Sequence, residues 1–283
     1  MKLLVYGAGV LGSLFAVRMH EAGHEVALLA RGKRLAALRR HGVLLAEGDS
    51  PDVRAVPVPI AERPENGYDL TAVLVRTHQV DAVLESLAGV DGDVLFLLNW
   101  AAGPQPLQAA LGPGRVLIGF PMNGGTMDGD VVRYRASSAV TRLVPMPIGE
   151  PDGSLTPRLE RIVRTFRAAG LPAQAEPRMN DWLRTHAALE VPLGQAVHAA
   201  GGPKALAADT YAIRSLIHRW RRELPAELFP RWSGLVRTVP EGVMTTVLRR
   251  FLRSTVAGHS GLADGGPATI GELDRLAEQL RHS

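Results

Sequence analysis

The residues with the clearest chemistry lie near the start of the chain. Gly7, Gly9 and Gly12 form a Gly-x-Gly-x-x-Gly pattern, with Val10 and Leu11 at its last two variable positions. In such a loop the first glycine permits a tight turn, the second lets the backbone approach a pyrophosphate, and the third lets a helix pack on the preceding strand. The phosphates then meet the helix N-terminus. The pattern predicts a dinucleotide-binding loop made by these five residues; a plain tight turn in an α/β domain is the alternative.

The basic residues that follow indicate which dinucleotide would bind. Loops that bind NAD are followed about 20 residues later by Asp or Glu, at the end of the second strand. This chain has Arg31 there, followed by Lys33 and Arg34. A carboxylate would repel a 2′-phosphate, whereas a guanidinium binds it through paired hydrogen bonds. The sequence therefore favours NADP(H) over NAD(H), with Arg31 as the main contact and Lys33 or Arg34 in support. A solvated basic helix start is the alternative.

Two further polar residues follow apolar segments that suit buried strands. Arg76 comes directly after residues 70–75, and Asn99 comes directly after residues 93–98. Ligands of open parallel sheets bind at the carboxyl ends of the strands, so we expect both side chains beside the glycine loop. The amide of Asn99 can bind a nicotinamide ribose or a substrate oxygen; a role in a turn is the alternative.

The first half of the chain provides the elements that must position these residues. Short apolar segments alternate with segments of helical periodicity, joined by short links. We expect strands over residues 2–6, 25–29, 70–75, 93–98 and 116–120, and helices over 13–22, 34–41, 80–87 and 107–111. This alternation is typical of a parallel, doubly wound sheet. Residues 131–147 have a strand-rich pattern that predicts an antiparallel extension.

The second half has a helical pattern. An amphipathic helix is expected over 156–169, and no strand is expected beyond residue 177. The further helices are expected over residues 181–200, 206–222, 242–256 and 269–281. The predicted fold is α/β: an N-terminal Rossmann-type doubly wound parallel sheet that binds NADP (residues 1–176), followed by an all-helical C-terminal domain (177–283) for substrate binding and dimerisation.

Composition excludes several classes of function. The 283 residues are 46% hydrophobic and 21% charged, which suits a globular protein with a real core. Without cysteine there is no disulfide, thiolate metal site or cysteine nucleophile, and no histidines and acids have metal-ligand spacing. The arginines are scattered among acids rather than gathered in a nucleic-acid-binding tract. No apolar run approaches the roughly 18 residues of a membrane span, and no leader pattern is present. We expect a cytoplasmic protein with a small-molecule substrate and no metal, nucleic-acid or membrane partner.

The sequence also resembles a known family. GAGVLGSLFAVRMHEAGHEVALLARG is similar to the opening of the ketopantoate reductases, the NADPH-dependent enzymes of pantothenate synthesis, and the similarity continues in RTHQVDAVLESL, LLNWAAGP, VLIGFPMNGGTMDG and MNDWLRTHAAL. The resemblance implies a Rossmann domain and a helical domain with the substrate between them; a homodimer is one assembly that it allows. It implies cofactor contacts from the glycine loop, Arg31, Arg76, Asn99 and Gly124.

The catalytic positions depart from that family. Its catalytic lysine lies two residues after a tryptophan, but here Trp182 is followed at that position by Arg184. The family's substrate-binding asparagine is Ala188, and its later glutamate falls within residues 259–266, where no acid matches. Arginine keeps its proton, so it can polarise an oxygen but is a poor proton donor. The resemblance implies that Arg184 and Asn99 bind substrate, and we do not expect that substrate to be ketopantoate.

Glu190 is a candidate for the missing acid. It interrupts the apolar stretch AALEVPL, where a charge is costly unless it is paired or functional. His186 lies four residues earlier, so the two side chains share a helix face. Glu190 is therefore either catalytic or paired structurally with His186 or a neighbouring arginine.

Three functions follow from these patterns. The leading hypothesis is an NADP(H)-dependent oxidoreductase of the ketopantoate reductase superfamily that reduces a carbonyl or imine. The altered catalytic positions motivate an alternative, a non-redox cyclase, lyase or isomerase of specialised metabolism that uses the pocket between the domains. Because the cofactor residues are better kept than the catalytic ones, a non-catalytic NADP(H)-binding sensor is the other alternative.

Overall fold

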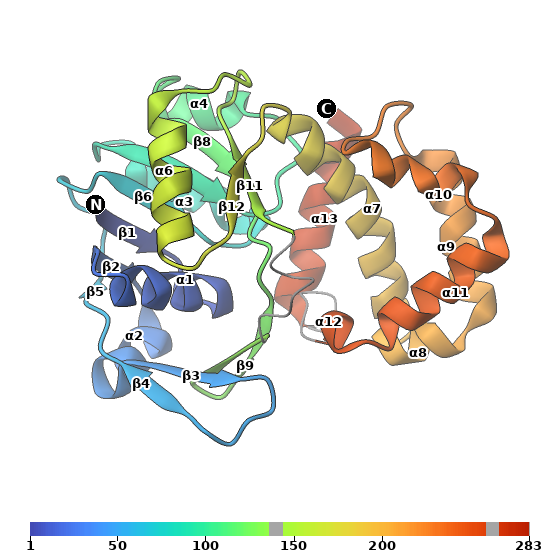
Figure 1. Ribbon diagram of the computed structural model, residues 1–283, viewed down its shortest axis with the longest axis horizontal. Coiled ribbons are helices and arrows are strands. Elements are labelled where there is room, and N and C mark those ends of the chain that lie inside the picture. Colours follow the sequence, from blue (N-terminus) through green and yellow to red (C-terminus); the bar gives the residue numbers. More distant parts are fainter. Residues whose placement is uncertain (136–143, 259–265, 283) are drawn as a thin grey trace. The chain divides into compact units, whose positions relative to one another are not determined.

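The computed structural model describes residues 1–135, 144–258 and 266–282. The chain forms two compact units (Figure 1). The first comprises Met1–Leu98 and Pro104–Met179, and the second comprises Asn99–Gly103 and Asn180–Ser283. The first unit is α/β and the described part of the second is helical, which confirms the predicted fold class.

The first unit is built on an eight-stranded sheet. Across the sheet the strands are β12 (Ala173–Ala175), β11 (Met146–Gly149), β8 (Val116–Gly119), β7 (Asp93–Leu97), β6 (Leu70–Val73), β1 (Lys2–Tyr6), β2 (Glu25–Leu29) and β5 (Ile60–Ala61). All neighbours pair in parallel except β11 and β8, which are antiparallel. From β1 the chain adds β2 and β5 on one side and β6, β7 and β8 on the other. This reversal of strand order is the doubly wound arrangement. In such sheets ligands bind at the carboxyl ends of the two strands beside the reversal, which here are β1 and β6.

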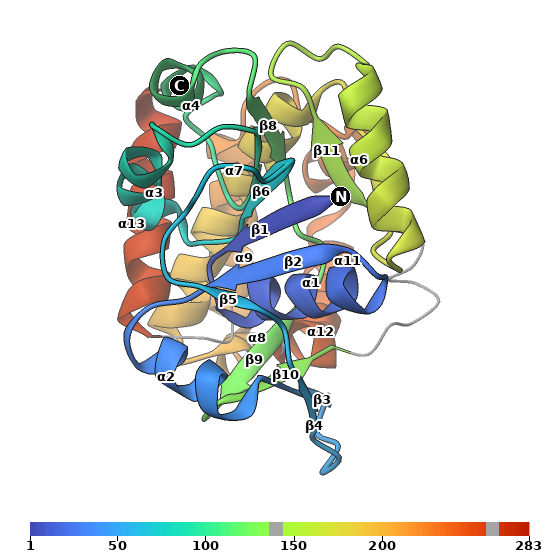
Figure 2. The same cartoon turned by 90° about the vertical axis from the view of Figure 1, so that its left-hand side faces the viewer.

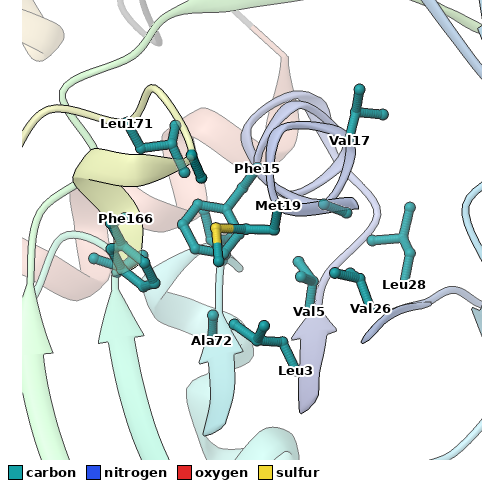
Figure 3. Packing of buried hydrophobic residues seen from close by; sticks show 14 of the residues in the cluster. Leu3, Val5, Phe15, Val17, Met19, Val26, Leu28, Ala72, Phe166 and Leu171 are labelled. Atoms are coloured by element: carbon teal, nitrogen blue, oxygen red, sulfur yellow. The ribbon is translucent and has the colours of Figure 1, made fainter. Parts of the chain in front are cut away.

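Helices cover both faces of this sheet. Helices α1 (Val10–Glu21) and α6 (Pro157–Ala168) lie on one face, and α3 (Val80–Leu87) and α4 (Gln105–Leu111) lie on the other (Figure 2). On the first face the rings of Phe15 and Phe166 pack edge to face, with centroids 5.0 Å apart, beside Leu3 and Val5 (Figure 3). Successive strand residues point to opposite faces, so Tyr6 points towards α3.

A smaller sheet contains the remaining strands of the described residues. Its order is β4 (Arg54–Val56), β3 (Val43–Glu47), β10 (Val131–Tyr134) and β9 (Gly125–Asp128). The sequence analysis did not predict β3 or β4. The strand-rich segment is divided between the sheets, because β10 pairs with β3 and β9, whereas β11 extends the main sheet antiparallel to β8. Helix α2 (Gly32–His41) follows β2, and the short helix η1 (Thr77–Gln79) precedes α3.

The second unit contains helices throughout its described residues. They are α7 (Met179–Ala199), α8 (Pro203–Ala208), α9 (Thr210–Glu223), η2 (Arg231–Gly234), α10 (Leu235–Thr238), α11 (Glu241–Leu252), α12 (Thr255–Gly258) and α13 (Pro267–His282). The single helix predicted over 206–222 is two helices. Asp209 leaves the helical conformation, and its side chain accepts a hydrogen bond of 2.9 Å from the Ala212 N–H, which caps α9.

Candidate functional site

The three glycines of the loop after β1 have different reasons to be glycine. Gly7 has φ +114°, and a Cβ there would lie 2.4 Å from the Leu74 carbonyl oxygen. A Cβ on Gly12 would lie 1.8 Å from the Gly7 carbonyl oxygen. The fold therefore requires both residues. Gly9 has an ordinary φ of −74°, and a Cβ there would meet no heavy atom within 4 Å. The fold does not require glycine at position 9, and the space beside Gly9 is open.

The first turn of α1 faces this loop without a side-chain cap. The helix begins at Val10, three residues earlier than predicted, so Val10, Leu11 and Gly12 form its first turn. Gly9 is the N-cap and the first turn contains no acid. The first N–H groups of a helix have no partner within it and carry partial positive charge. This turn can therefore bind phosphate, and the missing side chain of Gly9 leaves room for one.

Arg34 braces the glycine loop from α2. Its Nε donates to the Ala8 carbonyl at 3.1 Å, its Nη2 to Ser13 Oγ at 3.3 Å, and its Nη1 to the Asp130 carbonyl at 2.9 Å. Burial lowers the pKa of the Arg34 guanidinium, and the charge of Asp130 opposes that shift. Its donors are used by the protein itself, so Arg34 holds the loop in shape. Lys33, next to it, is exposed.

Arg31 lies at the end of β2 with its charge available. It is exposed and serves as the N-cap residue of α2. Its Nη2 donates to the hydroxyl of Tyr6 at 2.8 Å, and its guanidinium carbon lies 5.7 Å from the centre of the Tyr6 ring. No carboxylate within the described ranges forms an ion pair with Arg31. The side chain is thus oriented by a neutral group and retains its charge for an anion.

Arg76 and Gly124 lie at neighbouring edges of the same unit. Arg76 follows β6, and its backbone N–H donates to Gln79 Oε1 at 3.0 Å, which fixes the turn into η1. Gly124 is buried, and its carbonyl accepts a 2.9 Å bond from the Arg135 N–H. A Cβ on the adjacent Gly125 would lie 2.9 Å from Val10 Cγ1, so this segment borders the first turn of α1. The first unit therefore brings Gly124 to the glycine loop and places Arg76 at the switch point.

Asn99 follows β7, within the short segment that belongs to the second unit. It is half-buried. The segment is tied down by its neighbours, because Ala101 N donates to Gln279 Oε1 at 2.9 Å and Trp100 Nε1 donates to the Gly103 carbonyl at 2.6 Å. The carboxyl end of β7 is thus continued by a well-anchored loop of the helical unit.

Arg184 lies on α7 and is half-buried. Its guanidinium forms no hydrogen bond or ion pair with any residue that the structure describes. A guanidinium without a partner in a half-buried position can bind a carboxylate or a carbonyl oxygen.

Glu190 lies on another side of the same helix. Its carboxylate is 2.6 Å from His186 Nε2, and the Trp182 ring stacks on the His186 ring with centroids 5.0 Å apart. With 3.6 residues per turn, Glu190 is about 120° around the helix from Arg184. The structure therefore joins Glu190 to His186 and Trp182, and it does not place Glu190 beside Arg184. Most of the segment 259–266, in which the family's glutamate falls, lies outside the described residues.

The sequence model of one protein family matches half of the chain. The sequence model of the family described as ketopantoate reductase PanE/ApbA matches residues 3–147. The chain belongs to the ketopantoate reductase family. This membership confirms the resemblance inferred from the sequence motifs.

Curated relatives of the ketopantoate reductase family align with part of the chain. The 2-dehydropantoate 2-reductase of Archaeoglobus fulgidus is 30% identical over 175 residues, which cover 62% of this chain and 55% of that protein. The enzyme of the same name from Pyrococcus horikoshii is 26% identical over 185 residues, covering 64% and 58%. The chain thus spans less than two thirds of the length of these relatives.

Solved structures share the fold of this ketopantoate reductase family member over its full length. A putative ketopantoate reductase from Ralstonia solanacearum MolK2 has a TM-score of 0.66 at 17% identity and covers 99% of this chain and 98% of its own. The ternary structure of D-mandelate dehydrogenase with NADH and anilino(oxo)acetate has a TM-score of 0.69 at 15% identity, covering 100% and 99%. At these identities the likeness establishes the fold.

Neither a metal-binding cluster nor a membrane-spanning helix occurs in the described part of this family member. No group of three or more histidines and acids there could hold a metal ion. None of the helices there combines the length and the apolar character that crossing a membrane demands.

Two contacts of the candidate site were not predicted from the sequence. Arg34 was expected to support a phosphate, and the structure shows that it donates to the Ala8 carbonyl of the loop and to Ser13 Oγ of α1. Tyr6 was treated only as a strand residue, although it holds Arg31. The signal for Tyr6 was its position: a residue with a polar tip at the end of β1, directly before the glycine loop.

Proposed function

We propose that this chain is an NADP(H)-dependent oxidoreductase that reduces the carbonyl or imine group of a small molecule other than ketopantoate. The observation that carries the proposal is the open space at Gly9, beside an uncapped helix N-terminus. The relatives are named as reductases of a 2-keto acid, and a protein of the same fold was solved with NADH. The preference for NADP(H) rests on Arg31 and on the lack of an acid at the end of β2.

The residues of the first unit fit a dinucleotide. Gly7, Gly9 and the first turn of α1 (Val10, Leu11 and Gly12) would hold the pyrophosphate through backbone N–H groups. Arg31 would bind the 2′-phosphate, because its charge has no ion-pair partner among the described residues. Arg76 and Gly124 would provide further contacts, and Asn99, from the short segment of the second unit that follows β7, would add another. When bound, the cofactor would supply the hydride that reduces the substrate.

Residues of the second unit would handle the substrate. Arg184 would bind a carboxylate or the reacting oxygen and stabilise negative charge that develops on that oxygen. It would not protonate the oxygen, because a guanidinium keeps its proton at neutral pH. Asn99 would orient the substrate oxygen or the ribose through its amide. Glu190, paired with His186, is the candidate to hold the proton that Arg184 does not release. In this proposal the first unit binds cofactor and the second binds substrate.

A glycine substitution tests cofactor binding directly. Gly9→Ala adds a methyl group where the protein has open space, so the fold should be retained while the pyrophosphate is blocked. We expect NADPH affinity to fall at least tenfold, on the order of the loss of one good phosphate contact. Gly89→Ala is the matched control, because a Cβ there also meets nothing within 4 Å, away from the loop.

Turnover separates the three possible functions. The wild type is given NADPH with a panel of 2-keto acids, other ketones and imines, and NADPH oxidation is followed. Binding with turnover supports the proposal. Tight binding without turnover of any compound points to a sensor, and absence of binding of NADPH, NADP⁺ and NADH contradicts the proposal and favours a non-redox enzyme.

A further inference from the structure

A chain of polar groups runs from Arg31 into α3. Tyr6, the last residue of β1, is only 5% exposed. Its hydroxyl oxygen accepts from Arg31 Nη2 at 2.8 Å and lies 3.1 Å from Ser86 Oγ. Ser86 belongs to α3, and its Oγ lies 2.9 Å from the Val83 carbonyl oxygen. The end of β1, the start of α2 and the last turn of α3 therefore meet through one phenol group.

The direction of each hydrogen bond in this chain follows from the number of protons. A carbonyl oxygen can only accept, and a serine hydroxyl has a single proton. Ser86 therefore donates to Val83, and Tyr6 must donate its own proton to Ser86. A lone pair of the Tyr6 oxygen then remains for Arg31, which can only donate. Every proton is used once, so the phenol has a fixed orientation and each bond strengthens the next.

This arrangement restrains Arg31 without consuming its charge. Tyr6 is the only hydrogen-bond partner of the Arg31 side chain among the residues that the structure describes, and it accepts from one nitrogen of the guanidinium. The Tyr6 ring lies 5.7 Å from the guanidinium carbon and adds a second contact. The remaining N–H donors stay available. A long side chain that is already oriented loses less freedom when it binds a ligand.

We infer that Tyr6 is a positioning residue for cofactor selectivity. By holding the Arg31 guanidinium in place, its hydroxyl increases the affinity for a dinucleotide that carries a 2′-phosphate over one that does not. Tyr6 acts through Arg31. This inference rests on the proposed function, since it requires that Arg31 contact that phosphate.

Removing one oxygen atom tests the inference. Tyr6→Phe keeps the ring beneath Arg31 and deletes the hydroxyl. We expect the affinity for NADPH and for adenosine 2′,5′-bisphosphate to fall about three- to tenfold, as for loss of one hydrogen bond to a charged group. The affinity for NADH and for AMP should not change. Tyr68→Phe, which alters a half-buried tyrosine of the same unit, is the control and should change neither the NADPH-to-NADH affinity ratio nor the bisphosphate-to-AMP affinity ratio.

A double-mutant cycle separates positioning from a general structural effect. If Tyr6 acts through Arg31, Tyr6→Phe should have no further effect on these affinities in an Arg31→Ala background. Ser86→Ala provides an independent variant if Tyr6→Phe folds poorly. It leaves the phenol but removes the group that accepts its proton. The ratio of NADPH affinity to NADH affinity should therefore fall, by a smaller factor than in Tyr6→Phe.

The outcomes distinguish this inference from the proposed function. If the wild type prefers NADPH and both Tyr6→Phe and Ser86→Ala keep that preference while folded, the inference is overturned and the proposed function stands. If the wild type binds no dinucleotide, or binds NADPH and NADH equally, the assignment of Arg31 fails and the inference fails with it.

Discussion

The glycine loop and helix α7 differ in how the sequence determines the positions of their candidate site residues. In the loop, Gly7, Gly9 and Gly12 are close in space because they are close in sequence, and the φ angle and contacts of each explain its type. On α7, neighbours in sequence point in different directions, so Arg184 and Glu190 lie on different sides of one helix. The role of each residue in a loop that fixes its own backbone can be inferred from the local sequence. Which face of a helix contacts a ligand depends instead on the elements packed around that helix.

Gly12→Ala, a substitution in the glycine loop, should have the largest effect of these variants, a loss of folding stability. The added Cβ would lie 1.8 Å from the Gly7 carbonyl oxygen, so α1 and β1 would have to separate. We expect about 3–5 kcal/mol of destabilisation, the upper range for a single substitution. Denaturant unfolding measures this loss.

The companion variant Gly9→Ala sharpens the contrast within the loop. It should unfold within about 0.5–1 kcal/mol of the wild type, since its Cβ meets nothing. Equal losses of stability in Gly9→Ala and Gly12→Ala would show that the open space at Gly9 is not real.

Substitutions of Arg184 test the role of helix α7, and their expected effect is on the rate of substrate reduction. Arg184→Ala removes a guanidinium that has no partner among the described residues, so stability should change little. Reduction of the best substrate should fall about 100-fold, as for removal of one group that stabilises an oxyanion. Arg184→Lys restores a proton donor and should raise any reduction of ketopantoate. An unchanged rate in both variants would remove Arg184 from the site.

The same contrast explains how much of the molecule could be predicted from the sequence. Strands β1 and β2 were predicted to the residue, because continuous apolar segments between turn signals define buried parallel strands. Strands β3 and β4 were missed, because they are short or only partly buried and owe their state to pairing with each other and with β10. Tertiary context, not local preference, determines these elements.

The candidate site shows the same limit. The tight turn at Gly7–Gly12 and the helix that follows it were predictable because their geometry is local. That Arg34 would brace the loop and Arg31 would lie on Tyr6 was not, since both depend on contacts between residues 21 to 26 positions apart. Charge alone does not distinguish an arginine that holds the fold from one that binds a ligand.

Glu190→Gln gives a smaller effect on α7. The substitution keeps the shape and removes the charge that lies 2.6 Å from His186 Nε2 in a half-buried setting. We expect a loss of about 0.5–1 kcal/mol in stability, the usual range for one partly exposed ion pair. Glu160→Gln, in a more exposed i,i+4 pair of α6, is the control and should lose less.

Activity decides which role Glu190 has. A purely structural pair predicts that kcat retains its pH profile in Glu190→Gln once the protein is folded. If Glu190 holds the reaction proton, the limb of the pH profile that reports a protonated group should shift or disappear.

The smallest effect concerns His24, a histidine of the first unit. Its Nε2 is buried without a hydrogen-bond partner in the described residues, and no carboxylate there lies within ion-pair distance of it, whereas His186 has the Glu190 carboxylate at 2.6 Å. Burial lowers the pKa of His24 below its usual 6.5. Above that value both the folded and unfolded states are neutral and His24 does not affect stability. As the pH falls through 6.5, the unfolded state takes up the proton first, so stability declines until the folded state is protonated as well. His24→Gln should therefore lose less stability than the wild type between about pH 7.5 and 5.5, as measured by denaturant unfolding.

His41→Gln, at an exposed position of α2, is the control and should follow the wild type. A His24→Gln curve parallel to the wild type would mean that the imidazole reaches water, so that its proton uptake is the same in the folded and unfolded states.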